Sequence, residues 1–432
     1  MKKVWKYLII TILLLTGLFF VGLLFLFFVP SSSLFGITFI SYNDRQISNS
    51  YDISKVNSII LNSRSYDVEI ESTNSSTITA RVENHSLGYV LKRNSLLTLT
   101  EDFTNGVLTI TITEPYGVSF KNNSKIKLLI PKSAKEKSLD LTIENKNASV
   151  SFKDENVTIR NFTYKAESGV VNLKNVTLNG SLNLDLNKTI FNISSDAVLN
   201  DCNVSLKTTS GKFDASQSNI NNLNILKNER GIIVLDTCST ITQTETITGG
   251  RIEANKVNSI SFTGSDTNIY ISEITTRASI SMNNSGAGNV VIDKLSGIAD
   301  IVTGKGDIKI NNCTNYLTTL TTLSNNGGNI LVNNAYNKVF AETSSGNINI
   351  TFAEDASYIS QDNLNTRYFK GITSTGNITV NGINRTDIEI KDLNERMKEI
   401  GEEIKDAETK LSTTGFKCQS NLKEKKLIFF SI

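Results

Sequence analysis

The stretch Gly346-Asn347-Ile348-Asn349-Ile350 holds the pattern that decides the fold: a glycine, a polar residue, and then alternating apolar and polar residues. The same phrase returns as Gly376-Asn377-Ile378-Thr379-Val380, and it occurs earlier at residues 306–310 and 328–332. Counted from the glycine, apolar residues stand two and four places later. Because successive side chains of a strand point to opposite faces, this alternation predicts short strands with one buried face.

The same register recurs along the chain at twelve positions, which we call anchors. Nine anchors are glycines and three are other small or polar residues: Gly169, Gly211, Gly231, Gly250, Gly288, Gly306, Gly328, Gly346 and Gly376, with Ala148, Thr189 and Thr267. A spacing of about twenty residues is typical of one coil of a β-solenoid. Each coil also has a second alternating segment, such as Ile260-Ser261-Phe262. We therefore predict an all-β chain whose residues 136–383 form a β-helix-like solenoid of about twelve coils.

Proline and glycine agree with this fold. The three prolines are Pro30, Pro115 and Pro131, so none falls within the stacked strands, where a backbone N–H is needed. We expect the anchor glycines to mark corners with positive φ, which glycine adopts without steric cost. The last two anchors are farther apart than the others, which predicts an inserted loop at residues 354–370.

The N-terminus predicts a membrane anchor. Residues 1–6 include Lys2, Lys3 and Lys6, and residues 7–29 carry no charge. As a helix these 23 uncharged residues would span about 34 Å, enough for a hydrocarbon core of about 30 Å. The lysines favour a cytoplasmic N-terminus with the bulk outside. A cleaved signal peptide is the alternative, but the apolar run exceeds a typical signal core and no A-x-A-like site follows it. We therefore predict a single-pass cell-membrane protein.

The remaining segments flank the solenoid. Residues 30–38 are predicted as a linker, and residues 39–135 as a β-rich N-terminal module that covers the first edge of the stack. Residues 385–411 carry a heptad seam at Ile390, Leu393, Met397, Ile400, Ile404 and Leu411. We favour an amphipathic helix folded over the last coil. A coiled coil that joins a second copy or a membrane partner through residues 390–411 is the alternative. Residues 412–432 form a tail to which we assign no role.

Composition argues against several classes of function. The net charge of +2 gives no general attraction to nucleic acid. A single histidine, His85, excludes histidine clusters for a metal within one chain and leaves no second histidine for catalysis. Cys238 and Cys313 share a column but lie four coils apart, too far for a disulfide. We predict no catalytic residue, metal or cofactor, and therefore no enzyme.

Two features of the sequence bear on an enzymatic or sugar-binding role. Carboxylates and lysines gather within two coils, as they do in solenoid polysaccharide lyases: Asp293, Asp300, Asp307, Lys294, Lys305 and Lys309. We interpret them as solvated turn residues. Stacking of sugars has little support, because the one tryptophan is Trp5 in the apolar segment.

Three phrases resemble a known family: Tyr66-Asp67-Val68-Glu69-Ile70, Leu128-Leu129-Ile130-Pro131, and the repeated Ser/Thr-Gly-Asn-Ile. Together, over about Ile59 to Val380, they are similar to the bacterial family of unknown function labelled "putative adhesin". The resemblance implies an extracytoplasmic β-solenoid and supplies no catalytic residue. We predict that the chain acts as an adhesin-like surface scaffold or interaction module. A cell-envelope stress accessory acting through a membrane partner and a carbohydrate-active solenoid enzyme are the alternatives.

Overall fold

The computed structural model describes residues 2–28, 33–34, 37–90, 97–114, 117–122, 124–136, 138–153, 157–245, 247–283, 285–314, 320–336, 338–353, 369–384, 402 and 405. The heptad seam residues and the 412–432 tail lie outside these ranges, so the helix predicted there is still a prediction. Most of the expected 354–370 loop also lies outside them. Its last two residues were assigned wrongly, because β30 already begins at Phe369.

The described residues of the first part of the chain form one α-helix, two 3-10 helices and ten strands. They are α1 (Lys2–Phe28), β1 (Ser33–Leu34), β2 (Ile37–Ile47), β3 (Tyr51–Asp52), the 3-10 helix η1 (Ile53–Lys55), β4 (Ser58–Asn62), β5 (Asp67–Thr73), β6 (Thr77–Val90), β7 (Thr98–Thr104), β8 (Val107–Thr113), β9 (Gly117–Asn122), β10 (Lys125–Pro131) and the 3-10 helix η2 (Lys132–Glu136).

The rest of the described chain is a succession of strands. They are β11 (Asp140–Asn147), β12 (Val150–Phe152), β13 (Val157–Ile159), β14 (Asn161–Leu173), β15 (Val176–Leu178), β16 (Ser181–Ile193), β17 (Val198–Leu199), β18 (Asn203–Thr208), β19 (Lys212–Asn228), β20 (Ile232–Gln243), β21 (Arg251–Gly264), β22 (Asn268–Met282), β23 (Val290–Leu295), β24 (Ile298–Thr303), β25 (Ile308–Cys313), β26 (Leu320–Asn325), β27 (Ile330–Ala335), β28 (Lys338–Thr343), β29 (Ile348–Phe352), β30 (Phe369–Thr373), β31 (Ile378–Val380) and β32 (Ile383–Asn384).

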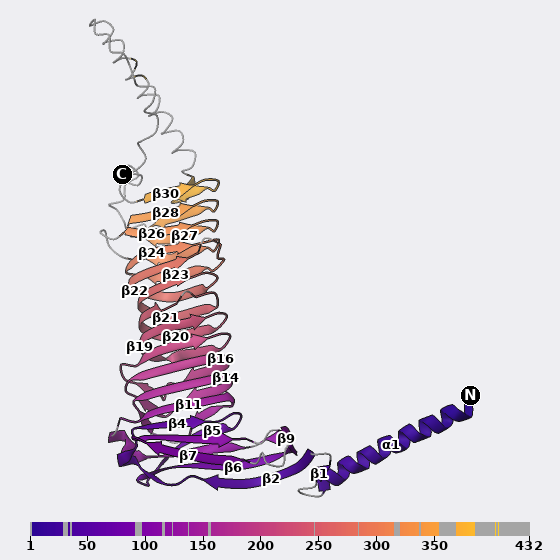
Figure 1. The fold of residues 1–432 in the computed structure, drawn as a ribbon. Coiled ribbons are helices and arrows are strands. Elements are labelled where there is room, and N and C mark those ends of the chain that lie inside the picture. Colours follow the sequence, from indigo (N-terminus) through magenta and orange to yellow (C-terminus); the bar gives the residue numbers. More distant parts are fainter. Residues whose placement is uncertain are drawn as a thin grey trace, which may run out of the picture.

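The strands stack into an upright rod, so the predicted all-β solenoid is confirmed (Figure 1). Two ladders of parallel strands run along it. The anchor ladder passes from β5 through β12 to β31, and in it Val68 pairs with Val150 and Val150 with Val171. The second ladder passes from β4 through β11 to β30. Longer strands such as β19 turn the corner and belong to both ladders. Below, "up" means toward the C-terminal end of the rod.

The interior explains why the apolar register repeats. Residues two and four places after each anchor point inward and are buried, as Ile348 and Ile350 are. One continuous apolar core runs from Ile53 to Val380. In the lower coils it contains a stack of aromatic rings, with Phe191 and Phe213 separated by 6.1 Å between ring centres. Burial of such a side chain stabilises the fold by about 1.5–3 kcal/mol. Each added coil therefore extends the same core.

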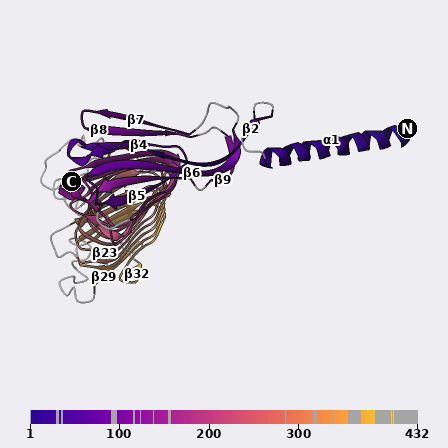
Figure 2. The same ribbon diagram turned by 90° about the horizontal axis from the view of Figure 1, so that it is seen from below.

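Both ends of the rod finish with antiparallel strands. At the base, β8 lies under β4 and pairs with antiparallel β7, while β6 pairs antiparallel with both β10 and β2 (Figure 2). At the top, β32 folds back on β31 through Asn381 and Gly382, which have φ of 50° and 78°. A reversed strand ends the parallel stack with a different edge, which limits further addition of strands.

The glycine anchors serve a purpose other than the expected one. Only Gly169 and Gly250 among them have positive φ, so that expectation is wrong for the other seven. The common cause is close approach of backbones. A Cβ built on Gly346 would lie 1.8 Å from the carbonyl oxygen of Gly328, the anchor one coil below, and one on Gly376 would lie 1.9 Å from that of Gly346.

A threonine three residues before the anchor completes this corner. Thr343 Oγ1 accepts from the Gly346 N–H at 3.1 Å and donates to the Gly328 carbonyl at 3.1 Å. Thr373 repeats both bonds with Gly376 and Gly346. Because Thr343 is buried, these bonds satisfy polar groups that would otherwise be costly inside the rod. The Thr-x-x-Gly pattern is therefore structural.

Helix α1 carries the segment Val4–Gly22, with a mean hydropathy of 2.1. By length and composition this segment is apolar enough to cross a membrane. A signal sequence near an N-terminus has the same properties, so the helix alone does not set the topology.

Candidate binding surface

The polar residue after each anchor belongs to a hydrogen-bonded ladder. Asn329 Oδ1 accepts from the backbone N–H of Asn347 at 3.0 Å, and Asn347 Oδ1 accepts from that of Asn377 at 2.9 Å. Lower in the same column, Asp307 accepts from the N–H of Asn329 at 2.7 Å. Each side chain thus bonds to the coil above. This column supports the stack and is already occupied by internal bonds.

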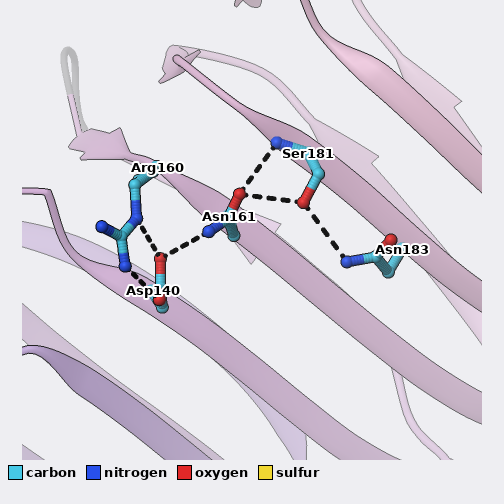
Figure 3. Close-up of polar contacts among 5 residues, drawn as sticks. All are labelled: Asp140, Arg160, Asn161, Ser181 and Asn183. Carbon is cyan, nitrogen blue, oxygen red and sulfur yellow. Dashed lines mark hydrogen bonds and ion pairs between the residues drawn. The ribbon is translucent and has the colours of Figure 1, made fainter. Parts of the chain in front are cut away.

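A second polar ladder lies at the start of the other sheet, in the lower coils. Asp140 accepts from Arg160 and from Asn161, and Asn161 Oδ1 in turn accepts from the N–H and the hydroxyl of Ser181 at 3.0 and 2.8 Å (Figure 3). Asn183 then donates to the Ser181 hydroxyl. Figure 3 shows these side chains pointing toward one another across neighbouring strands. They too are engaged within the solenoid.

The outer face of the second ladder holds a groove of about 570 Å³ lined by charged side chains. Successive coils place Glu144, Lys165, Asp185, Lys207 and Lys227 in one column. Lys207 contacts Asp185 at 3.1 Å, and Lys227 pairs with Glu229. Lysines and carboxylates therefore largely neutralise one another in this groove. We call it the charged groove.

The outer face of the anchor ladder holds a longer depression, formed by the third and fifth residues after each anchor. One part, of about 390 Å³, is lined by Ser151, Asn172, Lys174, Asn192, Ile193, Ser194, Asp214, Ser216 and Gln217. The next part, of about 240 Å³, is lined by Ser216, Val234, Leu235, Arg251, Glu253, Ala254, Asn255, Tyr270, Ile271, Ser272, Val291 and Asp293. Because both parts include Ser216, they adjoin. We call them together the polar furrow.

The upper part of the polar furrow contains an aromatic ring at its surface. The Arg251 guanidinium lies over the Tyr270 ring, 4.6 Å from its centre, and also pairs with Glu253. Tyr270 was not predicted as a site residue, because only tryptophan was considered for sugar stacking. The signal was an aromatic residue at an outward position, three places after an anchor, where the coils below mostly carry small polar, amide or acidic side chains.

The carboxylates considered as a lyase cluster do not converge. Asp293 and Asp307 lie on the anchor ladder, whereas Asp300 lies in β24 of the second ladder. Asp293 accepts from Asn311 at 2.8 Å, and Lys294 pairs with Glu273 at 2.8 Å. Asp293, Asp307 and Lys294 therefore each have a polar partner within the scaffold.

The described cysteine and histidine residues do not come together in a metal-binding or catalytic site. Cys202, Cys238 and Cys313 are buried free thiols, and Cys238 and Cys313 are separated by three intervening coils of one column. His85 lies in β6, opposite Asn43 of β2. Within the described ranges, no three His, Cys, Asp or Glu side chains gather in a way that would hold a metal ion.

Residues 56–257 match the family model described as Toastrack DUF4097. These residues form a Toastrack domain. The resemblance predicted from the Tyr66–Ile70 and Leu128–Pro131 phrases is thereby confirmed, although the upper coils extend beyond the matched segment. No curated protein matches the chain.

Solved bacterial structures resemble the chain at low identity. A "putative cell adhesion protein" from Clostridium sporogenes is 9% identical, with 62% of this chain and 99% of that one covered and a TM-score of 0.22. "Putative adhesins" from Parabacteroides merdae and Parabacteroides distasonis are 15% and 13% identical, with 78% and 79% of this chain and 95% and 97% of those chains covered and TM-scores of 0.19 and 0.25. Similarity at this level transfers no residue or ligand to the Toastrack domain described here.

Proposed function

We propose that this chain is a membrane-anchored, extracytoplasmic scaffold whose solenoid face binds polymers or proteins of the cell surface. The observation that carries the proposal is that the columns of side chains on the anchor ladder make different contacts. The inward column builds the core and the column next to the anchors bonds coil to coil. The third and fifth positions bond between some coils, as Asn192 does with Asn172, and they also line an open polar furrow along the rod. Stability therefore accumulates along the rod while this outer face stays open to a ligand.

The adhesin-like role can be tested with proteoliposomes that carry the full-length chain. We expect them to be retained on isolated cell-wall polymer or on whole bacterial cells, and empty liposomes to pass through. Equal passage of both would contradict the binding role.

The topology needs a separate test, because α1 fits both an anchor and a signal sequence. In a Cys418→Ser background, we expect a membrane-impermeant maleimide to label Ser216→Cys on intact spheroplasts. Lys3→Cys should be labelled only after lysis. Labelling of Lys3→Cys on intact spheroplasts would reverse the proposed orientation, and loss of Lys3→Cys from the mature protein would show that the segment is cleaved.

A further inference from the structure

The outward column of the anchor ladder changes character near the middle of the rod. Three places after their anchors, the lower coils carry Asn172, Asn192 and Asp214. The coils above carry, in order, Val234, Glu253, Tyr270 and Val291, all partly exposed and all lining the upper part of the polar furrow. Three of these four side chains are apolar or aromatic, so an apolar strip, interrupted by Glu253, lies on a face whose neighbouring positions are polar.

A polar border runs beside this strip, formed by the fifth residue after each anchor. It includes Asp236, Asn255, Ser272 and Asp293 in successive coils. Asn255 Nδ2 donates to Asp236 Oδ1 at 2.8 Å, which fixes the orientation of the amide. Hydroxyl, amide and carboxylate groups therefore stand at the coil spacing of about 4.8 Å along one edge of the strip.

Among the charged side chains that line this part of the furrow, Arg251 and Glu253 cancel each other, and Asp293 leaves a net negative charge. Arg251 pairs with Glu253 and at the same time covers the Tyr270 ring. Its charge is therefore shared between a carboxylate and an aromatic face, and it offers little attraction to a polyanion. A neutral ligand loses less hydration on entering such a surface than a charged one does.

We propose that the upper part of the polar furrow binds a neutral, extended polysaccharide lying along the axis of the rod. This rests on the proposed surface-binding function and names its ligand class. A sugar ring has C–H groups on its faces and hydroxyl groups around its edge. The strip of Val234, Tyr270 and Val291 can pack against the C–H faces of the sugar rings. The border that includes Asn255 and Ser272 can form hydrogen bonds with their hydroxyl groups.

The length of the furrow favours a polymer over a single sugar. From the coil of Ser216 to that of Asp293 the upper part spans four coil steps, or about 19 Å at a rise of about 4.8 Å, and the lower part continues the furrow to the coil of Ser151. Repeated weak contacts along one chain add through their high effective concentration. The charged groove is another depression of the described solenoid, but its paired lysines and carboxylates suit a neutral polymer poorly.

The test uses the purified full-length chain in detergent micelles, run in native gels that contain a soluble polymer. The polymers are hydroxyethyl cellulose, mixed-linkage β-glucan, mannan and, as a polyanion, polygalacturonate. We expect at least one neutral polymer to retard the wild-type chain. Tyr270→Ala should raise its dissociation constant about three- to tenfold. Leu331→Ala, which truncates a partly exposed side chain in the same column three coils up, should behave as wild type.

Each other outcome overturns the inference in a recognisable way. If the neutral polymers retard nothing, or retard Tyr270→Ala as strongly as wild type, the strip is not a glycan site. Retardation by polygalacturonate alone, abolished by Lys165→Glu, would assign binding to the charged groove and leave the surface-binding function intact. Binding of proteoliposomes to cells with no retardation by any polymer would point to a protein partner instead. Equal melting temperatures of the variants would show that a difference in retardation is not caused by loss of folding.

Discussion

A Cβ on Gly346 would lie 1.8 Å from the carbonyl oxygen of Gly328, the anchor directly below it. No real Cβ makes such a contact, so either the side chain or the coil spacing would have to yield. Because the Thr343 hydroxyl holds both glycines, the corner has little freedom to open. The recurring glycine is thus imposed by the distance between coils.

Gly346→Ala should therefore destabilise the solenoid by about 1–3 kcal/mol, the usual cost of forcing extra volume into a packed site. Gly327→Ala is a matched control in the same turn region, since its Cβ would meet the Ser345 hydroxyl at an ordinary 3.5 Å. We expect the control to be neutral or slightly stabilising. Urea unfolding of both variants measures the difference, and equal midpoints would show that the corner relaxes without cost.

Replacing a rung of the asparagine ladder should loosen the coil above it. In Asn329→Ala the N–H of Asn347 loses its acceptor, which we expect to cost about 0.5–1.5 kcal/mol because water replaces part of the bond. Asn329→Asp keeps an acceptor for that N–H, but it loses the bond from Nδ2 to Asp307 at 3.2 Å and places two carboxylates side by side, so it should be destabilising as well. Hydrogen exchange at the Asn347 amide is the measurement. If Asn329→Ala exchanged as slowly as the wild type there, the ladder would contribute nothing.

The sequence predicted the solenoid well because burial repeats with the anchors. Positions such as Ile348 and Ile350 must face the core in every coil, and that constraint leaves a visible period. The period does not reach β4 and β5, which were predicted as part of the β-rich N-terminal module and in which Val68 pairs directly with Val150. The strands β6 to β10 separate these two residues in the chain, so the period is interrupted there.

The outward positions were harder to predict for a physical reason. A side chain in solvent does not have to fit its neighbours, so no period marks it. Tyr270 was therefore missed, and the carboxylates Asp293 and Asp300 were grouped by sequence distance although they lie on different ladders. The positive φ expected at anchors was wrong at seven glycines because backbone approach, invisible in one coil alone, selects glycine too.

Acid should weaken the lower end of the rod through Glu69. Burial tends to raise the pKa of this carboxyl, but the ion pairs with Lys153 at 2.7 Å and Lys125 at 3.2 Å outweigh burial and lower the pKa below the ordinary 4.5. A depressed pKa contributes stability above the unfolded-state value, and that stability is lost as the pH falls through the folded value. The free energy of unfolding should therefore fall as the pH drops below about 4.5.

Lys153→Met should reduce this acid dependence, because the pKa of Glu69 would rise toward its unfolded value. Lys174→Met is the matched control, since Lys174 holds the same place one coil up and has no ion pair among the described residues. Urea unfolding between pH 3 and pH 7 compares the two. If the stability of Lys153→Met depended on pH in the same way as that of the wild type, Glu69 would not be the cause of the acid dependence.

The buried thiols should report on the integrity of the middle coils. Burial raises the pKa of both Cys202 and Cys238 to about 11, so few thiolates exist at pH 8, and both side chains are shielded from reagents. In a Cys418→Ser background we expect no modification by a maleimide in the native state and complete modification in denaturant. Native labelling of Cys238 would show that β20 opens from its neighbours.

Gly231→Ala, at the anchor of the same coil, should speed the labelling of Cys238, because its Cβ would lie 2.6 Å from the Thr208 methyl group.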